Sequence, residues 1–318
     1  MITGGAGFIG SNIARILLER GYRVYVLDDF FLGRRSNIRW LEARYRENIR
    51  VIEGSVLDPA ILSRIMSKCH YVIHEAAYSS APMFDSDPRQ GINVNILGFS
   101  NVLEIARRSN IRKVVYASTS SLYGGFDPPH REDLPVSPRT FYEYTMFARE
   151  HIARIYYDAY GVRSVGMRYF SVYGPNELHK GRYANVVTQF LWCMLKNKQP
   201  VIYGDGTQTR DFIYVDDVAE ATILAMENED LACDVINVGT GVETSFNEVI
   251  RLLQDACSRD VTPIYVENPI RRYVYRTRAD TAKAERILGF KAKVSVGEGV
   301  RKLVGIYSKI VDEIPEEW

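Results

Sequence analysis

The sequence predicts an α/β fold with a doubly wound parallel sheet and a smaller, interleaved C-terminal domain. Two observations predict this fold class. Short apolar runs alternate with amphipathic stretches through the first half of the 318 residues, and this rhythm breaks after about residue 170. Strand–helix alternation is typical of βαβ units, in which helices cover both faces of a parallel sheet.

The expected strands are short and apolar. The run VVYA within 113–119 shows no polar alternation, which is typical of a strand buried on both faces. The expected strands are 22–29, 48–54, 70–77, 113–119, 163–170 and 234–241. Apolar residues at helical spacing predict helices at 9–20, 59–67, 89–109, 141–160, 185–196, 215–227, 245–258, 281–288 and 296–311.

The change of rhythm marks a second domain. The stretch YGPNELHKGRY introduces Gly, Pro and Asn where the alternation ends, and a core-like strand, DVINVGTG, returns later. We therefore expect one domain of 1–170 plus about 212–240, and a second of about 171–211 plus 241–318.

Composition and charge exclude several classes of protein. A net charge of +1 gives no footprint for nucleic acid. The sequence has neither an apolar run long enough to span a bilayer nor a basic-then-apolar leader, so we expect a cytoplasmic protein without membrane contact. The four cysteines and five histidines are scattered without metal-binding spacing, so no metal is expected.

The chain opens with a glycine loop, ITGGAGFIG, which places Gly4, Gly7 and Gly10 before an amphipathic helix. Such glycines permit a tight turn and a close approach to a pyrophosphate, and the helix N-terminus offers unpaired N–H groups. Asp28 follows about 20 residues on, where an acid meets ribose hydroxyls. A purely structural turn is the alternative, but the context favours a Rossmann-type NAD-binding domain, and the acid disfavours NADP.

Several motifs occur together in the order of a known family. They are TGGAGFIGSN, HEAA, NVNILG, YASTSSLYG, SPRTFYEYT, MRYFSVYGP, YGDGTQTRDFIYVDDVAEA, NVGTG and ADTAKA, and they span nearly the whole chain. The sequence resembles the extended short-chain dehydrogenases/reductases of the nucleotide-sugar type, and among them the UDP-glucose (UDP-galactose) 4-epimerases. The resemblance implies NAD as cofactor, a UDP-sugar as substrate, and a homodimer that pairs through helices 89–109 and 141–160.

The resemblance also implies cofactor contacts, mostly in the first domain. The family usually has an acid just before Val56, where this chain has Ser55. The implied contacts are Gly4, Gly7, Phe8, Ile9 and Gly10 at the pyrophosphate, Asp28 at the ribose, Val56 at the adenine, Ala76 and Ala77 along the cofactor, Asn95 as support for the adjoining strand, and Tyr142 and Phe170 near the nicotinamide.

The implied catalytic residue is Tyr142, with Thr119 as its hydroxyl partner. A bulky tyrosine at position 277 excludes N-acetyl groups in the family, whereas Thr277 leaves room for them; an ordinary strand residue is the alternative there. The implied substrate contacts are Thr119 and Ser171 (commonly asparagine in the family), Asn185, Val186, Tyr203 and Arg210 at the nucleoside diphosphate, Arg276 as a further phosphate partner, and Thr277 beside the sugar's C2 substituent.

The residues after Thr119 separate the possible reactions. Relatives that dehydrate the sugar carry an Asp-Glu pair there, and relatives that decarboxylate uronic acids carry a glutamate two residues before the tyrosine of YG. Here Ser120, Ser121 and Leu122 follow, so neither acid is present. The resemblance therefore implies 4-epimerisation through a 4-keto sugar, with UDP-glucose and UDP-galactose as substrates.

Met146 departs from the family pattern, because the resemblance implies a lysine four residues after Tyr142. About one phenol in a thousand is ionised at pH 7, and the lysine ammonium lowers the phenol pKa and holds the nicotinamide ribose. Met146 does neither, so reduced activity is expected, although Arg139 and Arg149 lie close in sequence. Two alternatives remain: a non-catalytic NAD- or nucleotide-sugar-binding protein, or another enzyme that forms a 4-keto nucleotide sugar.

Overall fold

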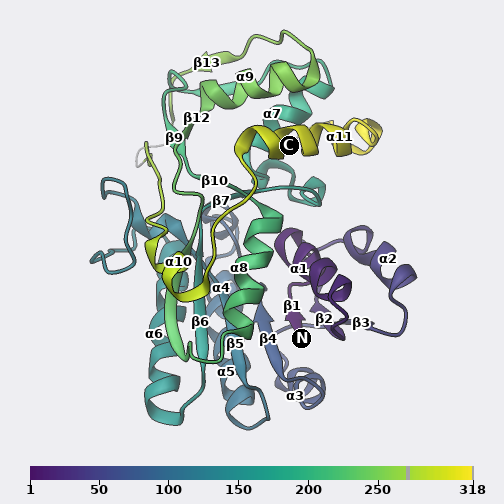
Figure 1. Cartoon of the computed structure of the whole chain (residues 1–318), viewed down its shortest axis with the longest axis vertical. Helices are drawn as coiled ribbons and strands as arrows, with labels where there is room; N and C mark the ends of the chain where they lie inside the picture. The colour runs from purple at the N-terminus through teal and green to yellow at the C-terminus, as the bar shows by residue number, and fades with distance from the viewer. Residues whose placement is uncertain (270–272, 317–318) are drawn as a thin grey trace.

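A computed structural model describes residues 1–269 and 273–316 of the chain. Its centre is a seven-stranded parallel sheet with the order β11-β6-β5-β4-β1-β2-β3 (Figure 1). This topology confirms the Rossmann-type fold. The strands are β1 (Ile2–Thr3), β2 (Val24–Asp28), β3 (Ile49–Glu53), β4 (Tyr71–His74), β5 (Lys113–Thr119), β6 (Ser164–Tyr169) and β11 (Cys233–Val238).

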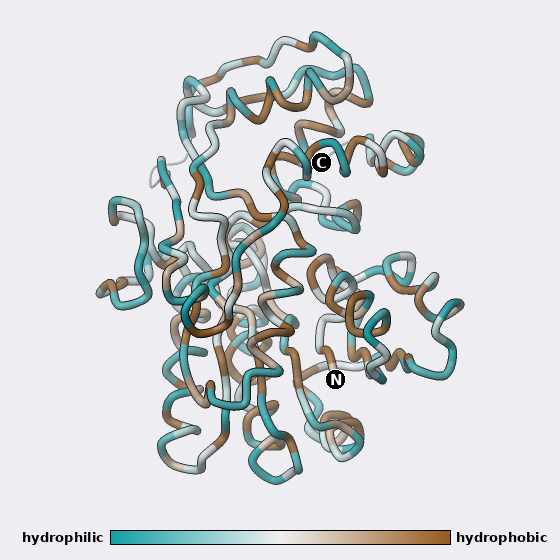
Figure 2. Tube along the Cα trace, viewed as in Figure 1, coloured by the Kyte–Doolittle hydropathy of each residue, from teal (hydrophilic) through white to brown (hydrophobic). Residues whose placement is uncertain are grey.

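Helices cover both faces of this sheet. One face carries α1 (Phe8–Glu19), α2 (Arg35–Arg44), α8 (Val215–Glu227) and α10 (Ala282–Leu288), and the other carries α3 (Pro59–Met66), α5 (Phe99–Arg107) and α6 (Phe141–Tyr160). Hydrophobic residues follow the strands and recur along the helices (Figure 2). The residues of β5 are buried throughout, as the unbroken apolar run VVYA predicted, and the residues of β6 are buried as well.

The expected helix 89–109 is wrong in its middle. The structure has α4 (Pro88–Ile92), then a π-helical segment, η2 (Asn93–Gly98), and then α5. The buried Asn95 within η2 bonds to the loop after β4 and to Thr145 of α6, so contacts with distant segments accompany the wider turn. Such π-segments are frequently found at functional sites.

Helix α6 has well-defined ends, which fixes the position of the residues it carries. The Thr140 side chain accepts a hydrogen bond from the Glu143 N–H at the start of the helix. At its end, Gly161 adopts the left-handed conformation with φ of 70°. The first is a standard signal for the start of a helix and the second for its end. Tyr142 therefore lies in the first turn of a helix whose register is set at both ends.

A second group of elements lies beyond the carboxyl ends of the sheet strands (Figure 1). It contains three helices and three short strand pairs around a separate cluster of buried side chains that includes Trp192 and Tyr307. This separate core supports the expected two-domain division, which remains a prediction. The elements are α7 (Val186–Leu195), α9 (Phe246–Cys257), α11 (Val296–Tyr307), β7 (Ser171–Tyr173) with β10 (Phe212–Tyr214), β9 (Thr209–Arg210) with β12 (Thr244–Ser245), and β8 (Val201–Tyr203) with β13 (Ile264–Val266).

Short helices complete the chain, and some expected boundaries shift. Helix α11 ends at Tyr307 instead of 311, and β4 ends at His74 instead of 77. The remaining short segments are η1 (Ala81–Phe84), η3 (Ser120–Tyr123), η4 (Leu178–Tyr183) and η5 (Val311–Glu313). Among the described residues, no helix combines the length and apolar character that a membrane span requires.

Candidate active site

A cavity of about 650 Å³ opens at the carboxyl ends of the sheet strands, where parallel α/β sheets bind ligands. Its walls come from the glycine loop, the ends of β2, β4, β5 and β6, and the first turns of α6. The structure brings the following expected residues together in its lining: Gly4, Gly7, Phe8, Ile9, Gly10, Asp28, Val56, Ala76, Ala77, Thr119, Tyr142, Met146, Phe170 and Ser171.

The glycine loop leaves no room for side chains where it packs most closely. Gly4 has φ of +66°, and a Cβ there would lie 2.7 Å from the Ala76 nitrogen. A Cβ on Gly10 would lie 2.4 Å from the Gly4 carbonyl oxygen. The N-cap residue of α1, Gly7, makes no side-chain capping hydrogen bond. The first N–H groups of α1 therefore remain available to a cofactor pyrophosphate.

Asp28 ends β2 at the cavity edge and is nearly buried. Its carboxylate accepts hydrogen bonds from the Ala6 N–H at 2.8 Å and the Phe30 N–H at 2.9 Å. Burial raises the pKa of Asp28, and these two hydrogen bonds act against that rise. Each carboxylate oxygen keeps a second lone pair, which fits the ribose hydroxyls of NAD. The site thus provides both the turn and the acceptor that this cofactor needs.

Tyr142 and Thr119 both line the cavity, from α6 and the end of β5. Burial raises the pKa of Tyr142, whereas a hydrogen bond with Thr119 and the charge of Arg149 lower it. Met146 is 2% exposed and forms an apolar part of the wall. The expected tyrosine and hydroxyl therefore line the same cavity, and Met146 stands where a lysine was expected, four residues after Tyr142.

Asn95 lies behind the cavity wall instead of in it. Its side chain accepts from the Tyr78 N–H at 2.8 Å and donates to the Tyr78 carbonyl at 3.1 Å. It also donates to the Thr145 hydroxyl at 2.9 Å. Asn95 thus joins the loop after β4 to α6, which is a supporting role of the kind that the family resemblance implied.

Glu75 is a cavity residue that the sequence reasoning missed. It follows β4, and the Tyr169 hydroxyl donates to its carboxylate at 2.9 Å. Burial raises the pKa of Glu75 to about 8, although the Tyr169 hydrogen bond and the charge of Arg149 act in the opposite direction. Glu75 is therefore mostly protonated at neutral pH. Its only signal in the sequence was a charged residue within the otherwise apolar strand end HEAA.

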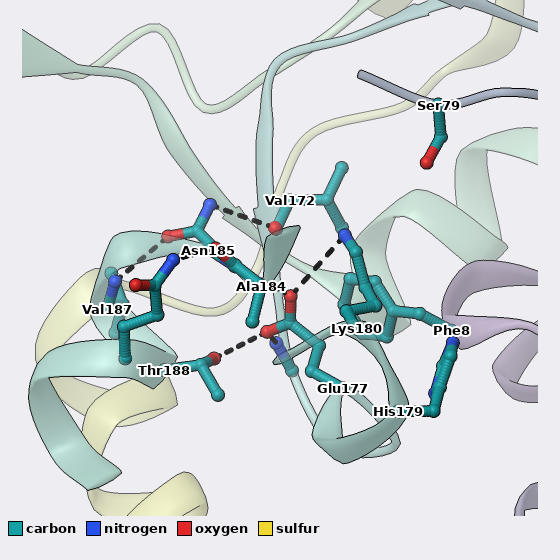
Figure 3. Close-up of polar contacts among 12 residues, drawn as sticks. Phe8, Ser79, Val172, Glu177, His179, Lys180, Ala184, Asn185, Val187 and Thr188 are labelled. Atoms are coloured by element: carbon teal, nitrogen blue, oxygen red, sulfur yellow. Dashed lines mark hydrogen bonds and ion pairs between the residues drawn. The ribbon is translucent and has the colours of Figure 1, made fainter. Parts of the chain in front are cut away.

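His179 and Lys180 are two further cavity residues that the sequence reasoning missed. Both come from η4, beside Phe8 of α1, and the Lys180 ammonium lies 5.2 Å from the Phe8 ring centroid (Figure 3). Burial and the neighbouring Lys180 charge lower the pKa of His179 to about 4, so the imidazole is neutral at pH 7. The basic letters HK in ELHKGRY were the available signal.

Asn185 and Glu177 organise the segment that follows β7. Asn185 caps α7 by accepting from the Val187 N–H at 3.0 Å and donates to the Val172 carbonyl at 3.0 Å (Figure 3). The buried Glu177 accepts from the Thr188 hydroxyl and the Asn185 N–H. These contacts hold η4 against α7, and with it the two basic cavity residues.

The remaining expected substrate residues lie outside the cavity lining and contact other protein groups. The Arg210 guanidinium lies 5.6 Å from the Phe246 ring centroid and 5.2 Å from that of Tyr273. Arg276 forms an ion pair of 2.8 Å with Glu243. The Thr277 hydroxyl accepts from the Asp211 N–H at 3.3 Å. The residues not brought into the cavity are Asn95, Asn185, Val186, Tyr203, Arg210, Arg276 and Thr277.

Comparison with known proteins identifies the class. Residues 1–239 match the NAD dependent epimerase/dehydratase family, and the chain belongs to that family. A putative UDP-glucose 4-epimerase of Methanocaldococcus jannaschii is 35% identical, over 96% of this chain and 96% of that protein.

Solved structures agree with this membership. UDP-glucose 4-epimerase from Thermotoga maritima, solved with UDP-glucose, has a TM-score of 0.89 and 33% identity over 98% of both chains. UDP-N-acetylglucosamine 4-epimerase from Methanobrevibacter ruminantium M1, solved with UDP-N-acetylmuramic acid, has a TM-score of 0.91 and 30% identity over 97% of both chains. Related enzymes have been solved with NAD, which is the cofactor of this family.

The relatives carry out more than one reaction. They include UDP-N-acetyl-alpha-D-glucosaminuronate decarboxylase of Bacillus cytotoxicus, 30% identical over 98% of both chains. The chain is therefore an NAD-dependent member of a family of UDP-sugar epimerases and decarboxylases.

Proposed function

We propose that this protein is a 4-epimerase of UDP-sugars, with UDP-glucose and UDP-galactose as its principal pair. One observation carries the proposal: Thr119 and Tyr142 line the same cavity, while the residues after Thr119 are Ser120, Ser121 and Leu122, without a carboxylate. A site that can remove and return a proton at one hydroxyl, and carries no acid in the three residues after Thr119, is suited to epimerisation.

The chain's own residues bind, orient and move a proton. The α1 N-terminus and Asp28 would hold NAD, and the bound cofactor would supply a reversible acceptor for the hydride at C4 of the sugar. Tyr142 takes the proton of the sugar's 4-hydroxyl, and the Thr119 hydroxyl, in the same lining, orients that sugar hydroxyl. Lys180 lies where it can neutralise part of a diphosphate beside the α1 N-terminus.

Product analysis tests the proposal. The NAD-loaded protein is incubated with UDP-glucose, UDP-galactose, UDP-N-acetylglucosamine and UDP-glucuronate, and the products are identified by NMR. We expect interconversion of a 4-epimer pair, and loss of that interconversion in Tyr142→Phe. If NAD and the nucleotide sugar bind but no sugar changes, the non-catalytic alternative replaces the proposal.

Glu75 favours a second candidate function. A protonated carboxyl group at the cavity is the kind of acid that a dehydratase or decarboxylase uses. Under this alternative the protein forms a 4-keto sugar and Glu75 delivers a proton to it after loss of water or carbon dioxide. Release of carbon dioxide from UDP-glucuronate would establish this reaction in place of epimerisation, and Glu75→Gln should then slow the proton uptake that follows that release.

We further propose a homodimer that pairs through α5 and α6. Large apolar side chains are exposed along α6, including Tyr144 at 61%, and Leu97 is exposed on the adjoining η2 segment. Tyr144 and Ile155 lie eleven residues, about three turns, apart on one face of α6. Light scattering at micromolar concentration should give twice the monomer mass, and Tyr144→Glu with Ile155→Glu should give the monomer.

A further inference from the structure

Arg149 shares a face of α6 with Tyr142 and Met146. It lies seven residues after Tyr142, about two helical turns. Side chains in a helix lean toward its N-terminus, so the long arginine side chain extends back toward the tyrosine. Met146 lies between them and is 2% exposed. A cation is therefore present on this face one turn later than the family's lysine.

Hydrogen bonds hold the Arg149 guanidinium beneath the cavity. Its Nε donates to the Asn95 carbonyl at 2.7 Å, and its Nη2 donates to the Ala76 carbonyl at 2.9 Å. Ala76 and Tyr142 both line the cavity. The ring of Phe99 closes the other side, with its centroid 5.7 Å from the guanidinium carbon. The guanidinium is thus fixed beneath the cavity that Tyr142 lines, by the strand end, the π-helical segment and α5.

This buried charge is not balanced by a nearby anion. Arg149 is 0% exposed, and within the described part of the chain its Nη1 has no hydrogen-bond partner and no carboxylate forms an ion pair with it. Burial lowers the pKa of Arg149 to about 10, so it still carries its charge at pH 7. An uncompensated buried cation is costly, and an anion formed beside it removes part of that cost.

The titratable groups around Arg149 leave Tyr142 as the group that can supply the anion. Glu75 has a pKa raised to about 8 by burial, and so is mostly neutral at pH 7. Burial and the charge of Arg149 itself lower the pKa of His74 well below its ordinary value, which keeps the imidazole neutral. Burial raises the pKa of Tyr116 far above 10. The Tyr142 phenolate, needed for the reaction, is the remaining candidate.

We propose that Arg149 takes over the electrostatic task of the lysine expected at position 146, and favours ionised Tyr142 from beneath the cavity. Arg149 acts through Tyr142 and is a positioning residue. The second task of that lysine, contact with the nicotinamide ribose, is left unfilled, because Nη1 is buried beneath the wall. The proposal rests on the proposed function only in that Tyr142 is the base of the sugar reaction.

A titration of Tyr142 tests this proposal without any sugar. The tyrosinate absorbance of the NAD-loaded protein is followed against pH, and the same curve for Tyr142→Phe is subtracted. Arg149→Met should raise the pKa of Tyr142 by at least one unit, a tenfold loss of phenolate at a given pH. Arg149→Lys should retain most of the effect. Arg154→Met, on the same helix but exposed, is the matched control and should change nothing.

Lysine at position 146 gives a second, independent test. In the Arg149→Met background, Met146→Lys should lower the pKa of Tyr142 by at least one unit and tighten NAD binding. In the parent, the new ammonium must share the site with Arg149, so the shift should be less than one unit. Non-additivity of this kind identifies two groups that serve one task.

Two results would overturn the proposal. One is an unchanged Tyr142 titration in a folded Arg149→Met protein. The other is a Met146→Lys shift of one unit or more in the parent, and this second result stands even where Arg149→Met does not fold. Failure of the sugar assay alone would contradict the proposed function and leave the titration intact, so the two conclusions are tested separately.

Discussion

The two halves of the site differ in how far folding alone assembles them. Beside the sheet, the glycine loop, Asp28 and Tyr142 line one cavity. In the C-terminal part, Arg210 and Arg276 lie outside that lining and contact other protein groups. The proposed cofactor contacts come from strand ends and helix starts, which the topology fixes. The proposed substrate contacts come from long side chains, which would have to exchange protein partners for a sugar nucleotide. Five predictions test this difference.

The largest effect is expected at Tyr142. Tyr142→Phe should lower epimerisation about a thousandfold, because general-base catalysis by a positioned side chain contributes roughly 10² to 10⁴. NAD affinity should change little, since the ring remains. NMR turnover and calorimetry with NAD measure the two effects. Tyr144, exposed on the same helix, provides the control, and Tyr144→Phe should retain full activity. If the Tyr142→Phe protein keeps more than a tenth of the parental turnover, Tyr142 is not the catalytic base.

The glycine loop should be almost as sensitive. Gly10→Ala places a Cβ 2.4 Å from the Gly4 carbonyl oxygen, so the loop must move away from the α1 N-terminus. NAD affinity should fall about a hundredfold, roughly 2.8 kcal/mol. Calorimetry with NAD measures this loss. Gly305→Ala in α11 is the matched control, because its Cβ meets no atom within 4 Å. Equal losses in both variants would show a general effect of destabilisation instead.

Glu75 should make stability depend on pH. Its pKa rises from an ordinary value of 4.5 to about 8 in the folded protein, so the folded state binds the proton more tightly than the unfolded chain does. The stability that this gives is full below pH 4.5 and is lost as the pH rises through 8. The Glu75→Gln protein does not undergo this loss. Between pH 5 and pH 8 its free energy of unfolding should therefore rise, relative to that of the parent protein, by on the order of 2 kcal/mol. Denaturant unfolding of both proteins at the two pH values measures this. If the variant and the parent differ by the same free energy at pH 5 and pH 8, Glu75 is not the group that titrates.

In the C-terminal half, Arg210 should affect the substrate alone. Arg210→Met should raise the KM for UDP-glucose about tenfold, as expected for loss of one charge-assisted hydrogen bond of about 1.5 kcal/mol. NAD affinity should be unchanged. Arg251→Met, on the exposed face of α9, serves as the control. An unchanged KM would show that Arg210 keeps its place between the Phe246 and Tyr273 rings when the sugar nucleotide binds.

The smallest effect is a change of preference at Thr277. Thr277→Tyr should lower turnover of UDP-N-acetylglucosamine severalfold while UDP-glucose turnover changes little, because a bulky ring would fill the space beside the C2 substituent. Parallel NMR assays of the two sugars give the ratio. Thr277→Ser, which keeps the acceptor for the Asp211 N–H, is the control. An equal decline for both sugars would mean that the ring disturbs packing and not specificity.

The sequence predicted the sheet well because buried parallel strands leave strong local signals. The expected strand 113–119 has the observed bounds of β5, and the other expected strands differ by three residues or fewer at each end. Helix α2 was missed because RSNIRWLEAR buries little besides Ile38 and Leu41, which gives a weak apolar period. The π-helical segment was missed because it is accompanied by contacts of Asn95 with segments distant in sequence.

The charge beside Tyr142 could not be placed from sequence either. The sequence shows Arg149 three residues after Met146. The position of its guanidinium, however, depends on hydrogen bonds to the carbonyl groups of Ala76 and Asn95, in other parts of the chain. The protonation state of Glu75 could not be predicted from the sequence either, because its pKa depends on burial in the folded structure. Motifs locate the residues of a site, whereas their charge states follow from three-dimensional neighbours.

The sheet order also has a consequence for synthesis on the ribosome. The edge strand β11 pairs with β6, and α8 packs against α1. In the sequence, β11 and α8 come only after β7, α7 and β8, which belong to the second group of elements. A nascent chain that has emerged only to residue 170 therefore lacks one edge and part of one face of its sheet. The sheet, although most of it comes first in sequence, cannot complete this edge until Val238 has left the exit tunnel, so translation presents an apolar surface to chaperones during that interval.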